Sequence, residues 1–450
     1  MADALDTIFK AYDVRGLYPE EIDESIARRI GNAFVVFTGA STVVVGHDMR
    51  PSSVPLSRAF IEGAVLAGAD VIDIGLSSTD MVYFASGLLD APAAQFTASH
   101  NPAQYNGIKM CRASAAPIGE ATGLLQIKEA VAADLLERAE EPGRVTQRGL
   151  LDEFAEHVRS FLADAGALRP LRVVADTANG MGGLVVPAVF EALPFELTIL
   201  YPELDGTFPN HPADPIQPEN LVDLQRAVHE HGADIGLAFD GDADRVFVVD
   251  DRAEPVSGSL TTAMVAHGIL ERSGPGEIVV HNLICSKAVP EIVREMGAEP
   301  VRTRVGHSFI KQVMAETGAV FGGEHSGHYY FRDNWRADSG LIAAMVVLEQ
   351  LSRSAEPLSV LRRPFERYAA SGEINSTVAD PHAVIDRIAT AYGSADQDRL
   401  DGLTVDCGDW WFNLRPSNTE PLLRLNLEAA DPAACAARTA EVLALVRGEA

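Results

Sequence analysis

The chain of 450 residues is too long for one hydrophobic core, since single cores stop growing at about 250–300 residues, so we expect two to four domains. Its hydrophobic fraction of 47% and charged fraction of 22% are ordinary for a globular protein and exclude a largely disordered chain. The net charge of −28 disfavours nucleic acid and anionic membrane as partners, because both attract basic surfaces.

The N-terminal stretch MADALDTIFKAYDVRG carries charges throughout and lacks an apolar run of signal-peptide length. No segment approaches the roughly 18 apolar residues of a membrane span, and the four cysteines are far apart without CxxC spacing. We therefore expect a cytoplasmic protein without a zinc site or a disulfide framework, present as a monomer or a small homo-oligomer.

One pattern recurs three times along the chain. A β-branched strand is followed by small or polar residues, a helix of 3.6-residue periodicity and a second strand. The pattern occupies residues 42–74, 171–201 and 277–305. Strand–helix–strand units of this length form parallel pairs with a right-handed crossover, so three copies predict three α/β domains built alike.

Polar or charged stretches at 138–149, 250–255 and 362–375 separate these units. The chain beyond them lacks the repeat and combines short strands with a final helix, which predicts a smaller α+β domain. The predicted fold class is therefore α/β, with three similar mixed-sheet domains plus a smaller C-terminal α+β domain. The predicted domains are residues 1–149, 150–252, 253–365 and 366–450.

The first candidate site is TASHNP at 97–102, which continues through YNGIK to Lys109. Proline prevents a regular helix across this segment, so Ser99 is expected on an exposed turn. Serine is a poor nucleophile without a base or a metal, and His100 is adjacent while Lys109 follows further along. A plain Ser/Asn turn is the alternative, and the absence of a GxSxG elbow excludes α/β-hydrolase chemistry.

The strongest signal is FDGDADR at 239–245. Asp240, Asp242 and Asp244 alternate between two apolar runs, so their carboxylates can converge at a strand end, where hard oxygen ligands suit Mg²⁺. An EF-hand loop is excluded because its sixth position would be Arg245 instead of glycine. A solvated acidic turn is the alternative, but bare carboxylates between buried strands repel one another unless a cation joins them. Arg245 adds a donor suited to phosphate.

Two further loops are rich in polar groups. In FGGEHSGHYY at 321–330 the paired glycines allow close backbone approach, and alternation could turn Glu324, Ser326 and His328 one way and His325 the other. In RPSNTEP at 415–421 an arginine fork and loop donors could hold phosphate. Plain turns are the alternative for both loops. The donors of the second loop are Arg415, Ser417, Asn418 and Thr419, and smaller candidates elsewhere are Tyr12, Arg15 and His307.

Together, a serine, a carboxylate metal site, a hydroxyl-reading loop and a phosphate nest indicate phosphoryl transfer, which depends on charge neutralisation and in-line positioning. A Walker A motif and a kinase glycine-rich loop are absent, so a nucleotide donor is not implied. The phosphate must then come from the substrate or from the enzyme itself.

TASHNP, DGDADR, GEHSGH and RPSNTEP, in this order across essentially the whole chain, resemble the motifs of the α-D-phosphohexomutases, most closely those of the bacterial phosphomannomutase branch. The resemblance implies four domains around a central cleft, with one motif from each domain. It also implies a phosphosugar substrate, one Mg²⁺ per chain, and a cycle in which phospho-Ser99 phosphorylates a hexose monophosphate. The hexose 1,6-bisphosphate formed is the intermediate and activator, and its other phosphate returns to Ser99.

The resemblance also implies roles for individual residues. Ser99, Asp240, Asp242 and Asp244 would hold the metal with the transferred phosphoryl group, and His100 and Lys109 match positions linked to proton transfer or ligand contact. Contacts with the substrate are implied for Tyr12, Arg15, Arg245, His307, Glu324, Ser326 and His328, and phosphate binding for Arg415, Ser417, Asn418 and Thr419.

The choice of sugar is less sharply encoded. GEHSGH and YDVRG are similar to the mannose branch, whereas phosphoglucomutases of the family often carry GEES, and phosphoglucosamine mutases carry GEQSGH and DGIRG. Mannose and glucose differ only at C2, so use of both sugars stays open. A phosphatase using the same serine and metal is a rival function. A sugar-phosphate sensor is another, although a sensor is expected to lack Ser99 or an aspartate.

Overall fold

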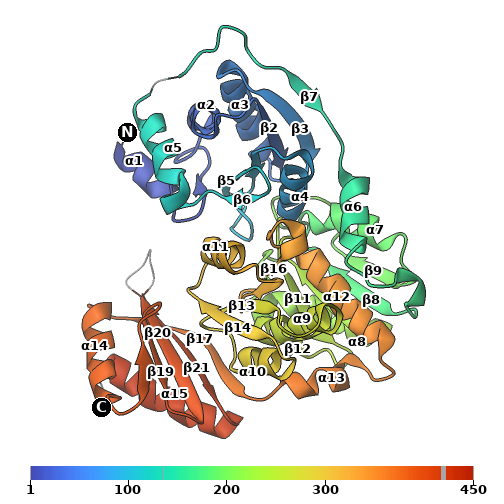
Figure 1. Ribbon diagram of the computed structural model, residues 1–450, viewed down its shortest axis with the longest axis vertical. Helices are drawn as coiled ribbons and strands as arrows, with labels where there is room; N and C mark the ends of the chain where they lie inside the picture. The colour runs from blue at the N-terminus through green and yellow to red at the C-terminus, as the bar shows by residue number, and fades with distance from the viewer. Residues whose placement is uncertain (1, 135, 417–421, 449–450) are drawn as a thin grey trace.

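The computed structural model describes residues 2–134, 136–416 and 422–448. Figure 1 shows domain I, in blue, at one end of the long axis and domain IV, in red, at the other, with domains II and III between them. Three domains with mixed sheets and one smaller α+β domain confirm the predicted fold class. The individual boundaries at 149, 252 and 365 stay a prediction.

Domain I has a sheet in the order β1-β5-β4-β2-β3-β7, with β6 paired to β5. Strands β2, β3, β4 and β7 run parallel, and β5 reverses direction. Its elements are α1 (Ala2–Ile8), β1 (Val14–Leu17), α2 (Glu24–Thr38), β2 (Thr42–His47), α3 (Ser53–Leu66), β3 (Asp70–Leu76), α4 (Thr79–Leu89), β4 (Ala93–Phe96), β5 (Tyr105–Arg112), β6 (Ala116–Pro117), the 3₁₀ helix η1 (Glu120–Thr122), α5 (Leu124–Ala132) and β7 (Val145–Gln147).

Domain II has the strand order β12-β11-β10-β8-β9, parallel from β10 to β9 and antiparallel at β11 and β12. Its elements are α6 (Leu151–Arg159), η2 (Ala165–Ala167), β8 (Arg172–Asp176), α7 (Gly182–Phe190), β9 (Glu196–Leu200), η3 (Pro218–Leu221), α8 (Val222–His231), β10 (Ile235–Phe239), β11 (Val246–Asp250) and β12 (Pro255–Val256).

Domain III has the order β14-β13-β15-β16, with only β16 antiparallel to its neighbour. Its elements are α9 (Gly258–Ser273), β13 (Ile278–Asn282), α10 (Ala288–Glu295), β14 (Glu299–Thr303), α11 (His307–Thr317), β15 (Phe321–Gly323), β16 (Tyr329–Phe331), η4 (Arg332–Asn334), α12 (Gly340–Arg353), α13 (Leu358–Leu361) and η5 (Arg363–Phe365).

The repeated sequence unit corresponds to β2–α3–β3, β8–α7–β9 and β13–α10–β14. In each case the two strands pair in parallel, as the pattern predicts. The first strand of each unit, β2, β8 or β13, is buried along most of its length, which is why its β-branched run is nearly continuous.

Domain IV is built differently. Its sheet is antiparallel, in the order β17-β21-β20-β19-β18. Asp380 and Asp431 cap its two long helices and are each followed by proline at the first helical position, a strong start signal. Its elements are β17 (Ala369–Thr377), α14 (Pro381–Ala391), β18 (Asp396–Asp398), β19 (Leu403–Asp406), β20 (Trp410–Pro416), β21 (Leu422–Ala429) and α15 (Pro432–Arg447).

The hydrophobic cores divide the molecule unequally. One continuous cluster runs from α4 of domain I through domain II to α12 of domain III, while the rest of domain I encloses a second core and domain IV a third. Domain IV meets domain III through polar contacts. Glu428 accepts from the Lys287 backbone N–H at 2.9 Å, the Lys287 ammonium reaches Asp406 at 2.7 Å, and the Tyr368 hydroxyl donates to Glu291 at 2.6 Å. Domains I to III therefore form one packed body to which domain IV is joined by hydrogen bonds and ion pairs.

No helix within the described ranges combines the length and the apolar character that a bilayer crossing requires.

Candidate active site

Three aspartates converge in the loop between β10 and β11. The flanking strands IGLAF and VFVVD are buried at every position, and they draw the loop between them into the interior. Asp240, Asp242 and Asp244 are each 0–1% exposed, and one carboxylate oxygen from each lies within 4.8 Å of the others. The alternating spacing in the sequence thus brings three negative charges to one point.

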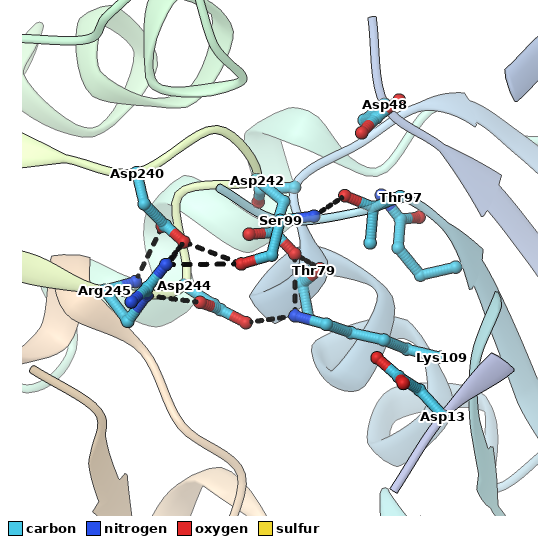
Figure 2. A network of polar contacts seen from close by, with 12 residues as sticks. Asp13, Asp48, Thr79, Thr97, Ser99, Lys109, Asp240, Asp242, Asp244 and Arg245 are labelled. Carbon is cyan, nitrogen blue, oxygen red and sulfur yellow. Dashed lines mark hydrogen bonds and ion pairs between the residues drawn. The ribbon is translucent and has the colours of Figure 1, made fainter. Parts of the chain in front are cut away.

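Ser99 of domain I lies directly on this loop (Figure 2). It is 4% exposed, so the expectation of an exposed turn is wrong, because the carboxylate loop of domain II packs against it. The chain leaves β4 and turns at Ser99, whose φ of 51° is left-handed, and the Ser99 N–H donates to Thr97 Oγ1 at 2.9 Å. The Ser99 hydroxyl donates to Asp240 Oδ2 at 2.9 Å. A Cβ on Gly241 would lie 2.4 Å from the Ser99 carbonyl oxygen, so only glycine allows the two loops to approach this closely.

Arg50 holds the serine loop from behind and was not identified from the sequence. Its guanidinium is 1% exposed and donates to four backbone carbonyls, those of Ser99 (2.9 Å), Asn101 (2.6 Å), Pro102 (2.8 Å) and Tyr105 (3.1 Å). Its Nε lies 3.2 Å from Asp48, which is also buried. Burial lowers the pKa of Arg50, opposed by the nearby carboxylate of Asp48. A planar fork with five donors suits this task, and a lysine ammonium could not reproduce it.

Lys109 supplies the first positive charge among the aspartates. Its ammonium lies 2.7 Å from Asp242 and 2.6 Å from Asp244, as the dashed lines in Figure 2 show. Burial lowers the pKa of Lys109, but the two carboxylates outweigh burial and hold it well above its ordinary value. For Asp242, burial alone would raise the pKa. The charge of Lys109 and the hydrogen bond from the Thr79 hydroxyl outweigh burial and bring the pKa of Asp242 below its ordinary value. In this structure Lys109 is therefore the cation that bridges Asp242 and Asp244.

Arg245 supplies the second positive charge. Its Nε and Nη2 donate to Asp240 Oδ2 at 2.9 and 2.7 Å, and its Nη2 also donates to His100 Nδ1 at 2.6 Å. Because arginine has no acceptor, Nδ1 of His100 must be unprotonated. Burial first, and then Arg245, hold the pKa of His100 well below its ordinary value. Although Ser99 Oγ lies 3.4 Å from the same nitrogen, that lone pair is already engaged by Arg245.

The donor set around the aspartates fits a hard divalent cation. Oδ1 of Asp242 and Oδ1 of Asp244 are buried and have no hydrogen-bond partner, so two ligand atoms are already desolvated and available. Burial, opposed in part by Arg245 and aided by the neighbouring carboxylates, raises the pKa of Asp240 to about 7. Three carboxylates against two cations leave an excess of negative charge that a metal ion would remove.

The predicted sugar loop forms a tight hairpin between β15 and β16. Residues 324–328 make the turn itself, with the Glu324 N–H donating to the His328 carbonyl at 3.0 Å, so the strict strand alternation expected from the sequence does not apply. Glu324 is 2% exposed and accepts from the Tyr330 hydroxyl at 2.5 Å and from Asn282 at 3.1 Å. The His325 side chain contacts Ser259 at 2.9 Å.

The remaining described candidates come from three domains. Tyr12 of domain I donates to the carbonyl of Val305 at 3.4 Å, and its ring packs edge-on against His307 at 5.0 Å. Burial raises the pKa of Tyr12, with the charges of Glu324 and Asp401 adding to the effect and those of Arg304 and Arg415 opposing it.

Two arginines predicted to bind the substrate have protein partners in the structure. Arg15 donates to Asn101 on the serine loop at 2.7 Å, and Arg415 pairs with Glu373 at 3.4 Å. The other three predicted phosphate ligands, Ser417, Asn418 and Thr419, lie outside the described residues. Ser326 is described and partly buried on the hairpin turn.

Two residues beyond the predicted set touch the reacting groups or their loop. Thr79, the first residue of α4, donates through its hydroxyl to Asp242 Oδ2 at 2.5 Å, and Arg50 holds the serine loop. For Arg50 a signal existed in the sequence, because HDMR follows a buried parallel strand, and charged residues at such strand ends face ligand sites. For Thr79 we find no local signal, since its partner is distant in the sequence.

A serine on a strained turn, facing three buried carboxylates and two fixed cations across a domain boundary, defines an enzyme that handles phosphoryl groups. Comparison with known proteins agrees. Four family models match consecutive parts of the chain, described as phosphoglucomutase/phosphomannomutase α/β/α domain I (residues 6–137), domain II (152–254), domain III (257–368) and the C-terminal domain (373–445).

Individual relatives match over nearly the whole length. A Xanthomonas campestris protein named "Phosphohexose mutases" is 42% identical over 445 residues, and an Escherichia coli K12 phosphomannomutase is 40% identical over 452; both alignments cover 98% of this chain and 99% of the relative. The crystal structure of a phosphoglucomutase/phosphomannomutase family protein from Burkholderia thailandensis superposes with a TM-score of 0.89 at 33% identity, covering 98% of both chains. The chain belongs to the phosphoglucomutase/phosphomannomutase family, whose members are isomerases, and the resemblance seen in its motifs is confirmed.

The Arg50 contacts lead to a first prediction. Arg50→Lys should lower kcat roughly 10–100-fold, because a displacement of about 1 Å at a reacting group is enough for a loss of this size. KM for the sugar phosphate should change little, since the groups predicted to read the sugar hydroxyls, Glu324, Ser326 and His328, lie on domain III. Steady-state kinetics on both parameters is the measurement, with Arg28→Lys, an exposed arginine of the same domain, as the matched control. A kcat equal to that of the control would contradict the role of Arg50.

Proposed function

We propose that this protein is a phosphomannomutase, which interconverts mannose 6-phosphate and mannose 1-phosphate through phospho-Ser99 and a hexose 1,6-bisphosphate intermediate. One observation carries the proposal. Ser99 of domain I donates to Asp240 of domain II at 2.9 Å, inside a buried group of three carboxylates and two cations. The curated relatives named phosphomannomutase, at about 40% identity over 98% of the chain, support mannose as the sugar.

In the proposed cycle the sugar hydroxyl attacks phosphorus, a new P–O bond to the sugar forms, and the bond between phosphorus and Ser99 Oγ breaks. The proton that the sugar hydroxyl loses ends on Ser99 Oγ, which leaves as a neutral hydroxyl. Lys109 and Arg245 neutralise charge on the phosphoryl oxygens without changing protonation state, because both are fixed as cations among the aspartates. His100 keeps Arg245 in place by accepting from its Nη2. The two residues predicted as catalytic partners of Ser99 thus act through charge and orientation.

Asp240, Asp242 and Asp244 would hold one Mg²⁺ together with a phosphate oxygen on Ser99. When bound, this ion supplies Lewis-acid stabilisation of the phosphoryl group. The two unpartnered Oδ1 atoms of Asp242 and Asp244 are the observation in favour, and neighbouring carboxylate oxygens suit magnesium better than a softer metal.

For the substrate we propose that the hairpin of Glu324, Ser326 and His328 reads sugar hydroxyls, while Arg415 holds the phosphate that is not transferred, with Ser417, Asn418 and Thr419 as further ligands. Tyr12, Arg15 and His307 would line the same space from domains I and III. The charges of Glu324 and Arg415 both act on the Tyr12 hydroxyl, which supports their placement around one bound molecule.

A dual-specificity mutase acting on mannose and glucose phosphates is the second candidate. His325 of the hairpin motif GEHSGH is partly buried and contacts Ser259 at 2.9 Å. We therefore expect no direct reading of C2 by this side chain, and one hydroxyl's orientation is a weak basis for discrimination. The name "Phosphohexose mutases" of the Xanthomonas relative is compatible with this wider range, and a phosphoglucosamine mutase is less favoured.

Coupled assays on the 1-phosphates of mannose, glucose and glucosamine test the choice of sugar. We expect mannose and glucose to differ in kcat/KM by less than about 200-fold, and glucosamine to be the poorest substrate. Inorganic phosphate measured in the same reactions should stay far below isomerised product. Release of phosphate as the main product would favour a phosphatase, and exclusive use of glucosamine phosphate would contradict both mutase candidates.

Ser99→Ala should lower mutase activity at least about a thousandfold, because the residue that carries the phosphoryl group has no substitute. Intact-protein mass spectrometry should show a phosphorylated fraction in the wild type and none in the variant. Calorimetric titration should show that sugar-phosphate binding persists. Ser25→Ala, an exposed serine in α2, is the control for handling and expression. Near-wild-type activity of Ser99→Ala would refute the phosphoserine cycle.

Removal of divalent metal with EDTA should stop turnover, and Mg²⁺ should restore it. Isothermal titration calorimetry should detect one Mg²⁺ per chain, and Asp244→Asn should weaken this binding at least about tenfold because one of three charges is lost. Glu230→Gln, an exposed acidic residue of α8, provides a control of equal charge change. Full activity in EDTA, or equal Mg²⁺ affinity in the two variants, would argue against the site.

A further inference from the structure

Lys311 in α11 is a buried lysine that the proposed mechanism does not use. It is 3% exposed, and its ammonium lies 2.8 Å from Oδ1 of Asp338, which is 3% exposed. Two buried charges are costly compared with a pair of apolar side chains of similar volume, so packing alone does not account for them. Their surroundings connect them to the active site.

The ammonium of Lys311 also lies over two aromatic rings. It is 4.0 Å from the centroid of the Tyr83 ring, on α4 of domain I, and 5.7 Å from that of Tyr330, on β16 of the sugar hairpin. Cation–π contacts of this kind are stronger where water is excluded. Lys311 is thus fixed between the domain that carries Ser99 and the hairpin that carries Glu324, whose carboxylate accepts from the Tyr330 hydroxyl.

Asp338, which is held by Lys311, also contacts His328. Its second oxygen, Oδ2, lies 3.0 Å from His328 Nδ1, and an ionised carboxylate can only accept, so the proton of this hydrogen bond sits on Nδ1. The imidazole is thereby held in one orientation, and Nε2 is the nitrogen left for a ligand. The same nitrogen, His328 Nδ1, also lies 3.8 Å from Oδ1 of Asp244 in the carboxylate loop, so the Nδ1 edge of the ring faces both carboxylates.

These contacts form a row of alternating charge through the molecule. Asp242 and Asp244 share Lys109, His328 stands between Asp244 and Asp338, and Lys311 ends the row. Asp244, His328 and Asp338 also have the proximity of a metal-binding group. Because Asp338 is already neutralised by Lys311, a second metal ion would have to displace a buried ammonium, which argues for an oriented histidine instead.

We propose that Lys311 and Asp338 are positioning residues, which fix the His328 imidazole with Nε2 presented to the bound hexose phosphate and tie the sugar hairpin to the carboxylate loop. Neither residue contacts the reacting atoms. The inference rests on the proposed function, in which His328 contacts the substrate, and it adds two residues that act through that histidine.

The test replaces both charges at once, so that neither is left unpaired. Lys311→Met/Asp338→Asn should lower kcat tenfold or more, with KM for mannose 1-phosphate changed less than about threefold, since Glu324 and the phosphate loop remain. Nitrogen-edited NMR at alkaline pH, with His328 assigned through His328→Gln, should show the Nδ1–H tautomer in the wild type and its loss or mixing in the double variant. Thermal melting accompanies both measurements.

Arg332→Met/Glu277→Gln removes a more exposed pair of domain III and serves as the matched control, with kcat expected to be unchanged. An unaltered kcat in the Lys311/Asp338 double variant, or an Nε2–H tautomer in the wild type, would overturn the positioning role. A wild-type protein without mutase activity would instead overturn the proposed function, and the tautomer measurement needs no substrate, so the two failures can be told apart.

Discussion

The mutual repulsion of three buried carboxylates is the constraint on which the site depends. Asp240, Asp242 and Asp244 are held by two apolar strands that leave the loop no freedom to move its charges into water. In a medium of low effective dielectric such charges require cations at contact distance. One of these cations, Lys109, comes from a strand of domain I, and the same domain brings Thr79 and Ser99 to the loop. The packing of domain I against this loop therefore brings a cation to the aspartates and places the serine beside them at the same time. Lys109 lies on β5, Ser99 follows β4, and Thr79 begins α4.

The division of the cores separates two tasks. The cluster that joins α4 of domain I to domains II and III holds the serine loop and the carboxylate loop together, and the contacts of Arg50 and Gly241 set their close approach. Domain IV has its own core and reaches domain III through Lys287, Glu428 and similar polar contacts, whose free energies are small compared with those of a shared core. Chemistry thus depends on the rigid part of the molecule. In the proposed cycle, domain IV would hold the phosphate that is not transferred. Its joint to domain III can adjust at the lowest cost in free energy, which would suit a site that accepts a hexose phosphate in two orientations.

The sequence predicted local features well and long-range ones poorly. The three strand–helix–strand units, the mixed sheets and the convergence of the aspartates follow from periodicity and spacing, which are properties of neighbouring residues. Arg50 illustrates the opposite case. Its four carbonyl partners lie 49 to 55 residues further along the chain, and the residues around HDMR contain no pattern that predicts which carbonyls Arg50 contacts. The alternation predicted for the side chains of residues 324–328 was wrong for a different reason. Alternation with a period of two holds only along a strand, and these residues form the turn between two short strands. The pairing of Lys311 with Asp338 was likewise invisible, because an ion pair carries no pattern in either local segment.

The strongly acidic composition raises the question of how the protein can hold an anionic phosphoryl group. The positive side chains at the site are not sufficient to attract a phosphoryl group, because each is already paired with a carboxylate. Lys109 and Arg245 stand against Asp240, Asp242 and Asp244, so this group of five carries one net negative charge. A phosphate placed on Ser99 would add to that charge in a buried position, at a large cost in free energy. A divalent cation among the carboxylates changes the local sum from minus one to plus one and turns the same loop from repelling a phosphate to attracting it. Metal binding and serine phosphorylation are on this reasoning coupled equilibria, and each should strengthen the other.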